Sequence, residues 1–165
     1  MKNCENIFTG YSGGTINITR RRLESLVGCP EVVSGDFFCA RNDELQNLVG
    51  GPKHVTGDYS CGSNKITSLE GCASHIGHIL SCPDTNITSL VGIHKIVKSC
   101  QSIEFDCIDI KQGGIGLLLI ENLTDISSEY APFYIIKSYL GTGTKGMMAC
   151  RAELISRGYE DYAKL

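Results

Sequence analysis

Apolar residues return along this chain at a regular interval of 21 or 22 residues. The interval is clearest in two ladders, formed by Leu26, Leu48, Leu69 and Leu90 and by Gly28, Gly50, Gly71 and Gly92. A repeat of this length is typical of a solenoid, in which one coil cannot bury its apolar side without its neighbours. The pattern therefore predicts a stack of coils, and we expect function on the surface of that stack.

Each repeat contains a short segment in which apolar and polar residues alternate, as they do in a β-strand with one buried face. The side chains predicted to point inward are Phe37, Cys39, Tyr59, Cys61, Leu80 and Cys82. Those predicted to point outward between them are Phe38, Ser60 and Ser81. Each coil is therefore expected to contribute one strand to a parallel sheet.

One segment matches a known repeat pattern closely. Residues 59–69 fit the leucine-rich-repeat pattern L-x-L-x-x-N-x-L-x-x-L in register. Its asparagine, Asn64, follows the strand where the chain must turn, and Asn42 has the same place one coil earlier. An amide side chain there can hydrogen-bond backbone groups that a buried corner would leave unpaired. Asn86 comes one position late in the third coil, so a different turn is expected there.

The same frame extends past the clearest repeats in both directions. A first strand is predicted near Thr15, segment 101–103 fills the strand position of the fourth repeat, and the apolar run 116–120 is predicted as the last strand. Between strands, proline, glycine and isolated valines favour an extended or turn-like return over a helix. The prediction is a mainly β, leucine-rich-repeat-like solenoid of about six short coils with one parallel sheet over residues 1–126.

After Ile126 the apolar spacing becomes helical. Apolar residues recur at three and four residues behind Pro132, which suits a first helical turn; they are Phe133, Ile136 and Leu140. A second helix is predicted over residues 144–157. Residues 127–165 are therefore expected to form a two-helix cap that covers the last strand and shares the core of the solenoid in one domain.

Composition and charge indicate where the protein is expected to act and which classes of partner are not expected. The chain has 165 residues, 42% of them hydrophobic, and a net charge of −3, which does not suit a surface that tracks nucleic-acid phosphates. Residues 1–10 lack the apolar core of a signal peptide, and no uncharged run is long enough to cross a membrane. We therefore expect a cytosolic protein that binds neither nucleic acid nor a membrane.

The sequence contains nine cysteines, and the repeat accounts for several of them. Cys39, Cys61 and Cys82 share a position that Ile18 and Ile103 occupy in the flanking coils. A cysteine that exchanges with isoleucine behaves as a small buried apolar residue. Reduced thiols inside the stack are therefore predicted, rather than a disulfide framework.

Three features of the chain point together to a known family. They are the repeated phrase Ser-Leu-x-Gly-x-Pro-x-x-Val-x-Gly-Asp-Phe/Tyr-x-Cys-x-x-Asn, the segments 92–96 and 116–120, and the tail segments 139–141, 150–155 and 162–165. With them, nearly the whole chain resembles leucine-rich-repeat-like proteins encoded by tailed bacteriophages. That family has no settled activity and no established catalytic residues. The resemblance therefore implies a fold, a phage origin and a setting in the cytoplasm of a bacterial host.

Histidine and cysteine form one candidate ligand set. The spacing Cys72-x2-His75-x2-His78-x3-Cys82 contains the two thiols and two imidazoles that tetrahedral zinc accepts. The repeat already assigns Cys82 to the core, so we expect no metal here. His75 and His54 hold equivalent positions of adjacent coils and are expected to lie near one another.

A glycine-rich segment forms a second candidate. Residues 141–146 match G-x-G-x-x-G before a helix, so Lys145 is a candidate anion contact. A dinucleotide site requires a strand before this motif, whereas a helix is predicted there. The sequence offers no Ser/His/Asp or Cys/His set for nucleophilic catalysis. We therefore expect no enzyme activity and no cofactor.

The outward strand face remains as the predicted contact surface. The residues predicted to contact a partner are Asp36, Phe38, Asp58, Ser60, Ile79, Ser81 and Ser102. Phe38 supplies an aromatic anchor, and Asp36 stacked near Asp58 supplies local negative charge. Cys100 and Glu104 are expected on the same face. Arg20, Arg21 and Arg22, at one turn, are expected to form a solvated corner.

Together with the phage origin that the resemblance implies, these observations predict a non-enzymatic phage protein that binds a bacterial host protein, such as a component of an anti-phage defence system, and inhibits it. Two alternatives stay open. One is a sponge that captures a nucleotide immune signal at an oligomer interface, and the other is a structural or assembly protein of the phage particle. The oligomeric state does not follow from the sequence.

Overall fold

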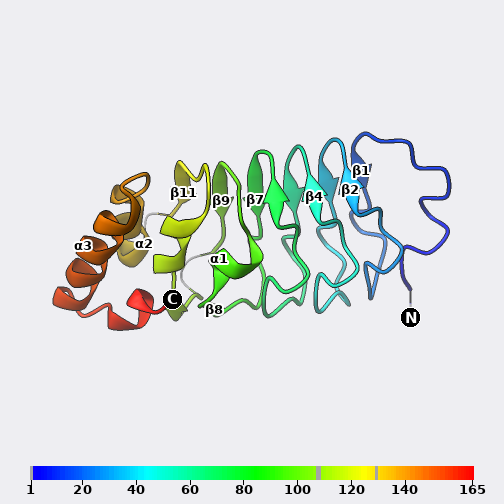
Figure 1. The fold of residues 1–165 in the computed structure, drawn as a ribbon. Coiled ribbons are helices and arrows are strands. Elements are labelled where there is room, and N and C mark those ends of the chain that lie inside the picture. The colour runs from blue at the N-terminus through cyan, green and yellow to red at the C-terminus, as the bar shows by residue number, and fades with distance from the viewer. Residues whose placement is uncertain (1, 107–108, 129) are drawn as a thin grey trace.

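The computed structural model describes residues 2–106, 109–128 and 130–165. Its coils stack side by side, with the N-terminal segment at one end and helices at the other (Figure 1). One parallel sheet of six strands runs along the stack. In spatial order the strands are β1 (Ile16–Asn17), β3 (Phe37–Phe38), β5 (Tyr59–Ser60), β7 (Ile79–Ser81), β9 (Ser102–Glu104) and β11 (Asp125–Ser127). The predicted solenoid with a parallel sheet is confirmed.

Strand pairing places equivalent residues of successive coils side by side. The inner row of paired residues is Ile16, Phe37, Tyr59, Leu80, Ile103 and Ile126. Each member of this row is at most 3% exposed. Phe38, Ser60 and Ser81 alternate with them and are only half-buried, so they point outward as predicted. The alternation within each repeat thus separates an apolar interior from an outer face.

The return segments form a second sheet, where the sequence predicted only an extended or turn-like path. Its strands are β2 (Val32–Val33), β4 (His54–Val55) and β6 (His75–Ile76), and they pair in parallel. In each strand the second residue is buried and the first is exposed. A smaller parallel pair joins β8 (Ser89–Leu90) to β10 (Gln112–Gly113). Each coil is therefore held by backbone pairing on more than one side.

Buried asparagines hold the turns that follow the main strands, as predicted. The amide nitrogen of Asn42 donates to the carbonyls of Ile18 (3.1 Å) and Cys39 (2.8 Å). That of Asn64 donates to the carbonyls of Cys39 (3.1 Å) and Cys61 (2.8 Å). In the next coil Thr85 takes this place, and its hydroxyl donates to the Cys82 carbonyl at 3.2 Å. The different turn expected there is thus closed by a hydroxyl rather than an amide.

Glycine is required where the backbones of adjacent coils meet. A Cβ atom on Gly77 would lie 1.9 Å from the carbonyl oxygen of Thr56. A Cβ atom on Gly71, whose φ is +85°, would lie 2.3 Å from the backbone nitrogen of Val49. Neither space admits a side chain without moving the backbone, because the obstacle at each is a main-chain atom. The repeated glycines therefore set the close spacing of the coils.

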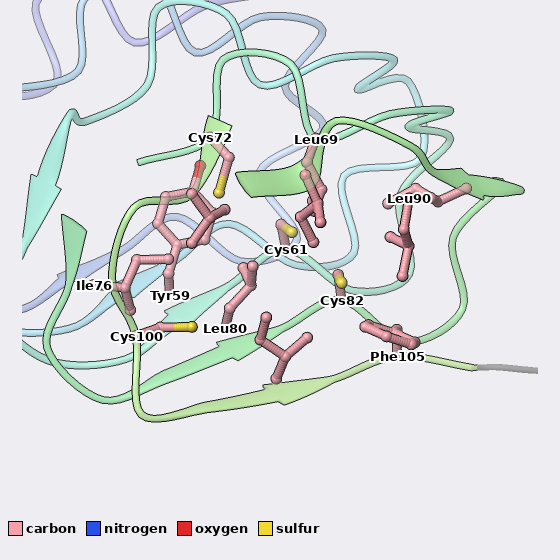
Figure 2. Packing of buried hydrophobic residues seen from close by; sticks show 14 of the residues in the cluster. Tyr59, Cys61, Leu69, Cys72, Ile76, Leu80, Cys82, Leu90, Cys100 and Phe105 are labelled. Carbon is pink, nitrogen blue, oxygen red and sulfur yellow. The ribbon is translucent and has the colours of Figure 1, made fainter. Parts of the chain in front are cut away.

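Figure 2 shows the sulfurs of four cysteines inside the stack, among leucine and aromatic side chains; they belong to Cys61, Cys72, Cys82 and Cys100. Cys39, Cys61 and Cys82 are each at most 1% exposed, which confirms the predicted ladder. The prediction for Cys100 is wrong, because it is 1% exposed instead of outward-facing. Cys100 precedes β9 at the corner where Ser99 bridges to the return side, so the alternation of β9 does not extend back to it.

The prediction of a last strand at residues 116–120 is also wrong. Residues 116–119 lie in the 3-10 helix η1 (Ile115–Leu119), and the last strand is β11. A short apolar run does not by itself distinguish a buried strand from a buried helix. Here Gly113 and Gly114 adopt positive φ and turn the chain, after which the Leu117 N–H bonds to the Gly114 carbonyl. The short helix α1 (Ile93–Ile96) was likewise not predicted.

The C-terminal segment caps the stack as expected. It comprises α2 (Ala131–Ser138), α3 (Gly143–Ser156) and the 3-10 helix η2 (Glu160–Ala163). The ring of Phe133 on α2 lies 5.2 Å from that of Phe105, and the Tyr162 hydroxyl donates to the Ile110 carbonyl at 2.8 Å. These contacts make one continuous core from solenoid to cap. Among the described helices, none has the length and apolar character needed to span a bilayer.

Candidate functional site

The outer face of the main sheet carries two rows of side chains. One row places Phe38, Ser60, Ser81 and Glu104 on successive strands. The second row contains Ile79 and Ser102, which pair directly, and Asp58 one coil earlier. Because the sheet spaces neighbouring strands by about 4.8 Å, residues of the same row lie within contact of one another.

A shallow hollow of about 200 Å³ lies between these rows. We call it the strand-face hollow, and its lining residues are Phe38, Asp58, Ser60, Ile79, Ser81 and Glu104. Five of the predicted contact residues therefore come together in it. Asp36 and Ser102 do not line it, although each contacts a lining residue through backbone pairing or a hydrogen bond. Glu104 is a lining residue outside the predicted contact set, and its outward place in β9 was the available signal.

The two predicted acidic residues serve the fold as well as the surface. The Asp58 N–H donates to Oδ1 of Asp36 at 2.9 Å, and the Ile79 N–H donates to Oδ1 of Asp58 at 3.2 Å. The Asp36 N–H in turn donates to Oγ1 of Thr15 at 3.1 Å. Each carboxylate thus satisfies a backbone donor of the next coil at the corner before the strand. His78 approaches this ladder, with Nδ1 3.8 Å from Oδ1 of Asp58.

The chemistry of the strand-face hollow is that of a contact surface. Phe38 and Ile79 are half-buried and supply apolar area, while two serine hydroxyls and the Glu104 carboxylate border it. Such a surface can pack against an apolar side chain and accept hydrogen bonds from a basic one. Phe38 is less exposed than expected, because it lies in a row with Asn17 and Ser60 on the adjacent strands.

The four candidate zinc ligands are not gathered. Cys72 and Cys82 lie in the core, whereas the exposed His75 ring stacks on His54, with 4.7 Å between ring centroids. His78 lies beside Asp58 instead. Within residues 2–106, 109–128 and 130–165, the structure contains no group of three or more side chains arranged to hold a metal ion.

Lys145 lies apart from the strand face. It is exposed in the first turn of α3, and the helix begins at Gly143, so the glycine-rich segment is split between a turn and a helix. No side chain caps this helix. The anion contact at Lys145 therefore stays a prediction.

The buried thiols of the core have low reactivity. Burial raises the pKa of the Cys39 and Cys72 thiols, and the neighbouring Cys82 thiol together with burial raises the pKa of Cys61. A thiol must ionise to act as a nucleophile or a metal ligand. These residues therefore act as apolar filling rather than as reactive groups.

The relation of the chain to known proteins adds no further constraint on the strand face. Comparison with family models, curated proteins and solved structures finds no match.

Proposed function

We propose that the protein is a non-enzymatic binding protein whose strand face engages a bacterial host protein. The observation that carries this proposal is the strand-face hollow, in which Phe38 and Ile79 are gathered with serine hydroxyls and the Glu104 carboxylate. Binding energy at protein interfaces concentrates in a few anchors that fill pockets, and aromatic residues are prominent among them. Phe38 is the expected anchor on this side of the interface.

The rigidity of the surface supports the same proposal. The hollow spans strands β3, β5, β7 and β9, whose backbones are paired in parallel along the stack. Side chains on such a scaffold lose little conformational freedom when a partner binds, so less of the interaction energy is offset by ordering. Glu104 and Asp58 give the hollow negative charge. We therefore expect a partner that presents an apolar group next to lysine or arginine.

The setting of this interaction is proposed from the resemblance to phage proteins. In that setting the protein acts in the cytoplasm of an infected bacterium, and its partner is a component of the host. Inhibition of an anti-phage defence system is the outcome we favour, because a binding protein acts on a host system by occupying one of its surfaces.

Affinity capture from host lysate tests the proposal with three proteins. The first is the wild-type chain, the second carries Phe38→Ala with Glu104→Lys, and the third carries Val32→Ala with Glu121→Lys. The third is a matched control, because Val32 is 57% exposed on the return-side sheet and Glu121 is exposed where that sheet is extended by a bridge. Circular dichroism verifies that all three fold.

We expect one stoichiometric host protein to be retained by the wild type and by the control, and lost by the strand-face variant. Equal recovery with all three proteins, or loss from the control alone, would refute the assignment to the strand face. If the protein were instead part of the phage particle, it would be found in purified particles at a fixed copy number.

A further inference from the structure

A second hollow, of about 560 Å³, lies at the turns that follow the main strands. We call it the arginine hollow. Its lining residues are Arg20, Arg22, Arg41, Asp43, Ser63 and Asp84. It shares no lining residue with the strand-face hollow. The sequence led us to expect a solvated corner at residues 20–22, but the structure adds Arg41 and Asp43 from the next coil and Asp84 from further along the stack.

The arginines occupy unusual backbone positions for their residue type. Arg20 and Arg41 hold the same place in successive coils, and both have a φ of +57°. Ser63 and Asp84 hold this place in the following coils, with φ values of +53° and +51°. Among residues other than glycine, asparagine and aspartate are the ones that most often adopt this conformation. The same turn forms in successive coils with arginine, serine or aspartate at this position. The conformation of the backbone therefore does not explain why arginine is present.

The turn that carries the arginines is firmly held. Oδ1 of the buried Asn42 accepts hydrogen bonds from the backbone N–H groups of Arg21 and Leu23, each at 3.0 Å. The Arg20 N–H donates to the Ala40 carbonyl at 3.2 Å, and the Arg41 N–H donates to the Gly62 carbonyl at 3.0 Å. The backbone that carries the guanidinium groups is therefore held in place by the buried Asn42 side chain and by carbonyl groups of the adjacent coil.

The charges in the arginine hollow are separated rather than paired. Across the described part of the chain, none of the guanidinium groups of Arg20, Arg22 and Arg41 forms an ion pair, although Asp43 and Asp84 line the same hollow. Asp84 instead accepts a hydrogen bond from the Ser63 hydroxyl at 3.2 Å. Like charges held near one another repel, and an anion between them removes that repulsion. The guanidinium group suits phosphate in particular, because its parallel donors match two phosphate oxygens.

We propose that the arginine hollow binds a small phosphorylated molecule that also carries hydroxyl or amine groups. Arg20, Arg22 and Arg41 bind the phosphate, and Asp43 and Asp84 accept hydrogen bonds from the donors at the other end of the ligand. Asp43 and Asp84 disfavour a continuous polyanion such as nucleic acid, because its phosphates would lie against both carboxylates. The hollow is large enough for a molecule of this size, and its charged lining residues are exposed to solvent and so can reach a ligand. This activity is independent of the proposed binding of a host protein.

Calorimetric titration with inorganic pyrophosphate, ribose 5-phosphate and ribose tests the proposal. The test variant carries Arg20→Gln with Arg41→Gln, and its control carries Lys95→Gln on α1 with Arg151→Gln on α3, so both lose the same charge. We expect the wild type and the control to bind both phosphates and the test variant to bind them at least about tenfold more weakly, because charge-assisted bonds are lost. Ribose without phosphate should not bind.

A third variant, Asp43→Asn, tests the acidic end of the site independently of the arginine end. It should weaken ribose 5-phosphate but not pyrophosphate, since only the former has hydroxyl donors. Melting temperatures verify that each variant is folded. The proposal is overturned if the folded wild type binds neither phosphate at millimolar concentration, or if the test and control variants weaken binding equally.

Discussion

The backbone N–H of Asn42 donates a hydrogen bond to the side-chain oxygen of Asn64, 2.7 Å away in the next coil. Asn42 supports the preceding coil in the same way, because its own side-chain oxygen accepts hydrogen bonds from the backbone N–H groups of Arg21 and Leu23. Two buried amides thus connect three successive turns. This ladder of asparagine hydrogen bonds both stabilises the stack and positions the turn that carries the arginine hollow.

The first prediction follows from this ladder. Asn42→Ala removes four side-chain hydrogen bonds and leaves buried backbone groups unpaired. Each unpaired buried group costs about 1–3 kcal/mol, partly relieved by water entry at the turn, so we expect the free energy of unfolding to fall by about 3 kcal/mol. Urea denaturation measures the loss. Asn86→Ala is the control, because Asn86 is exposed, and an effect of similar size there would contradict the role of the ladder.

Close contact between coils supports a second prediction. Gly77→Ala would place a methyl group 1.9 Å from the Thr56 carbonyl oxygen, so the coils must separate locally. We expect a loss of about 3 kcal/mol, at the upper end of overpacking effects. Gly10→Ala is the comparison, because Gly10 has no neighbour within 4 Å and the cost there is only that of its positive φ, about 1 kcal/mol. Thermal unfolding of both variants gives the ranking, and a reversed order would show that coil spacing is not limiting.

The architecture could be predicted from the sequence where the period was long and unbroken. Phe37, Tyr59 and Leu80 were assigned to the interior because a two-residue alternation recurs inside a 21- or 22-residue repeat. The second sheet was missed because its segments, such as Val32–Val33, lie among proline and glycine residues that favour a turn-like path. The helix η1 was missed because its run of apolar residues has no polar member to indicate a period.

The strand-face hollow was largely predictable, and the arginine hollow was only half so. Outward residues such as Ser60 and Ser81 follow directly from the alternation that buries their neighbours. Arg20 and Arg41 are 21 residues apart, so the same period could have placed them side by side. The same period also brings Ser63 and Asp84 into this row, whereas the approach of Arg22 and Asp43 depends on how the turns fold over the ends of the strands, which the repeat length does not specify.

A third prediction concerns alkaline pH. Burial raises the pKa of the Cys100 thiol from 9.0 to about 12. In the unfolded chain the thiol ionises near pH 9, but in the folded protein it stays protonated until about pH 12, so its contribution to stability is complete below pH 9 and is lost above it. The loss is about 1.4 kcal/mol per pH unit over that range. Cys100→Ala should therefore flatten the decline of the free energy of unfolding between pH 9 and 11, as measured by urea denaturation at each pH. If the slope of the free energy of unfolding against pH did not change, the Cys100 thiol would already ionise in the folded protein over this range.

The fourth prediction concerns Cys4 and Cys29, whose sulfur atoms lie 3.0 Å apart although the residues are 25 positions apart in the chain. Cys4 belongs to the segment before the first strand and Cys29 to the first return segment, so their contact ties the N-terminal segment to the stack. The Cys29 thiol donates to the Cys4 sulfur, which lowers the pKa of Cys4, and the same contact together with burial raises the pKa of Cys29. One thiol of the pair is thus easier to ionise, and its partner stands within reach.

Mild oxidation of the folded protein with diamide should join this pair before any other. Diamide takes up the two electrons and two protons that the thiols lose as the sulfur–sulfur bond forms, and the closed loop should stabilise the fold by about 3 kcal/mol. Peptide mapping without reductant identifies the bond, and the melting temperature reports its effect. Cys4→Ser should abolish both, whereas Cys150→Ser, a buried cysteine on α3, should change neither. A first bond between Cys61 and Cys82 would contradict the prediction, because it would mean that the core ladder opens more readily than the N-terminal segment.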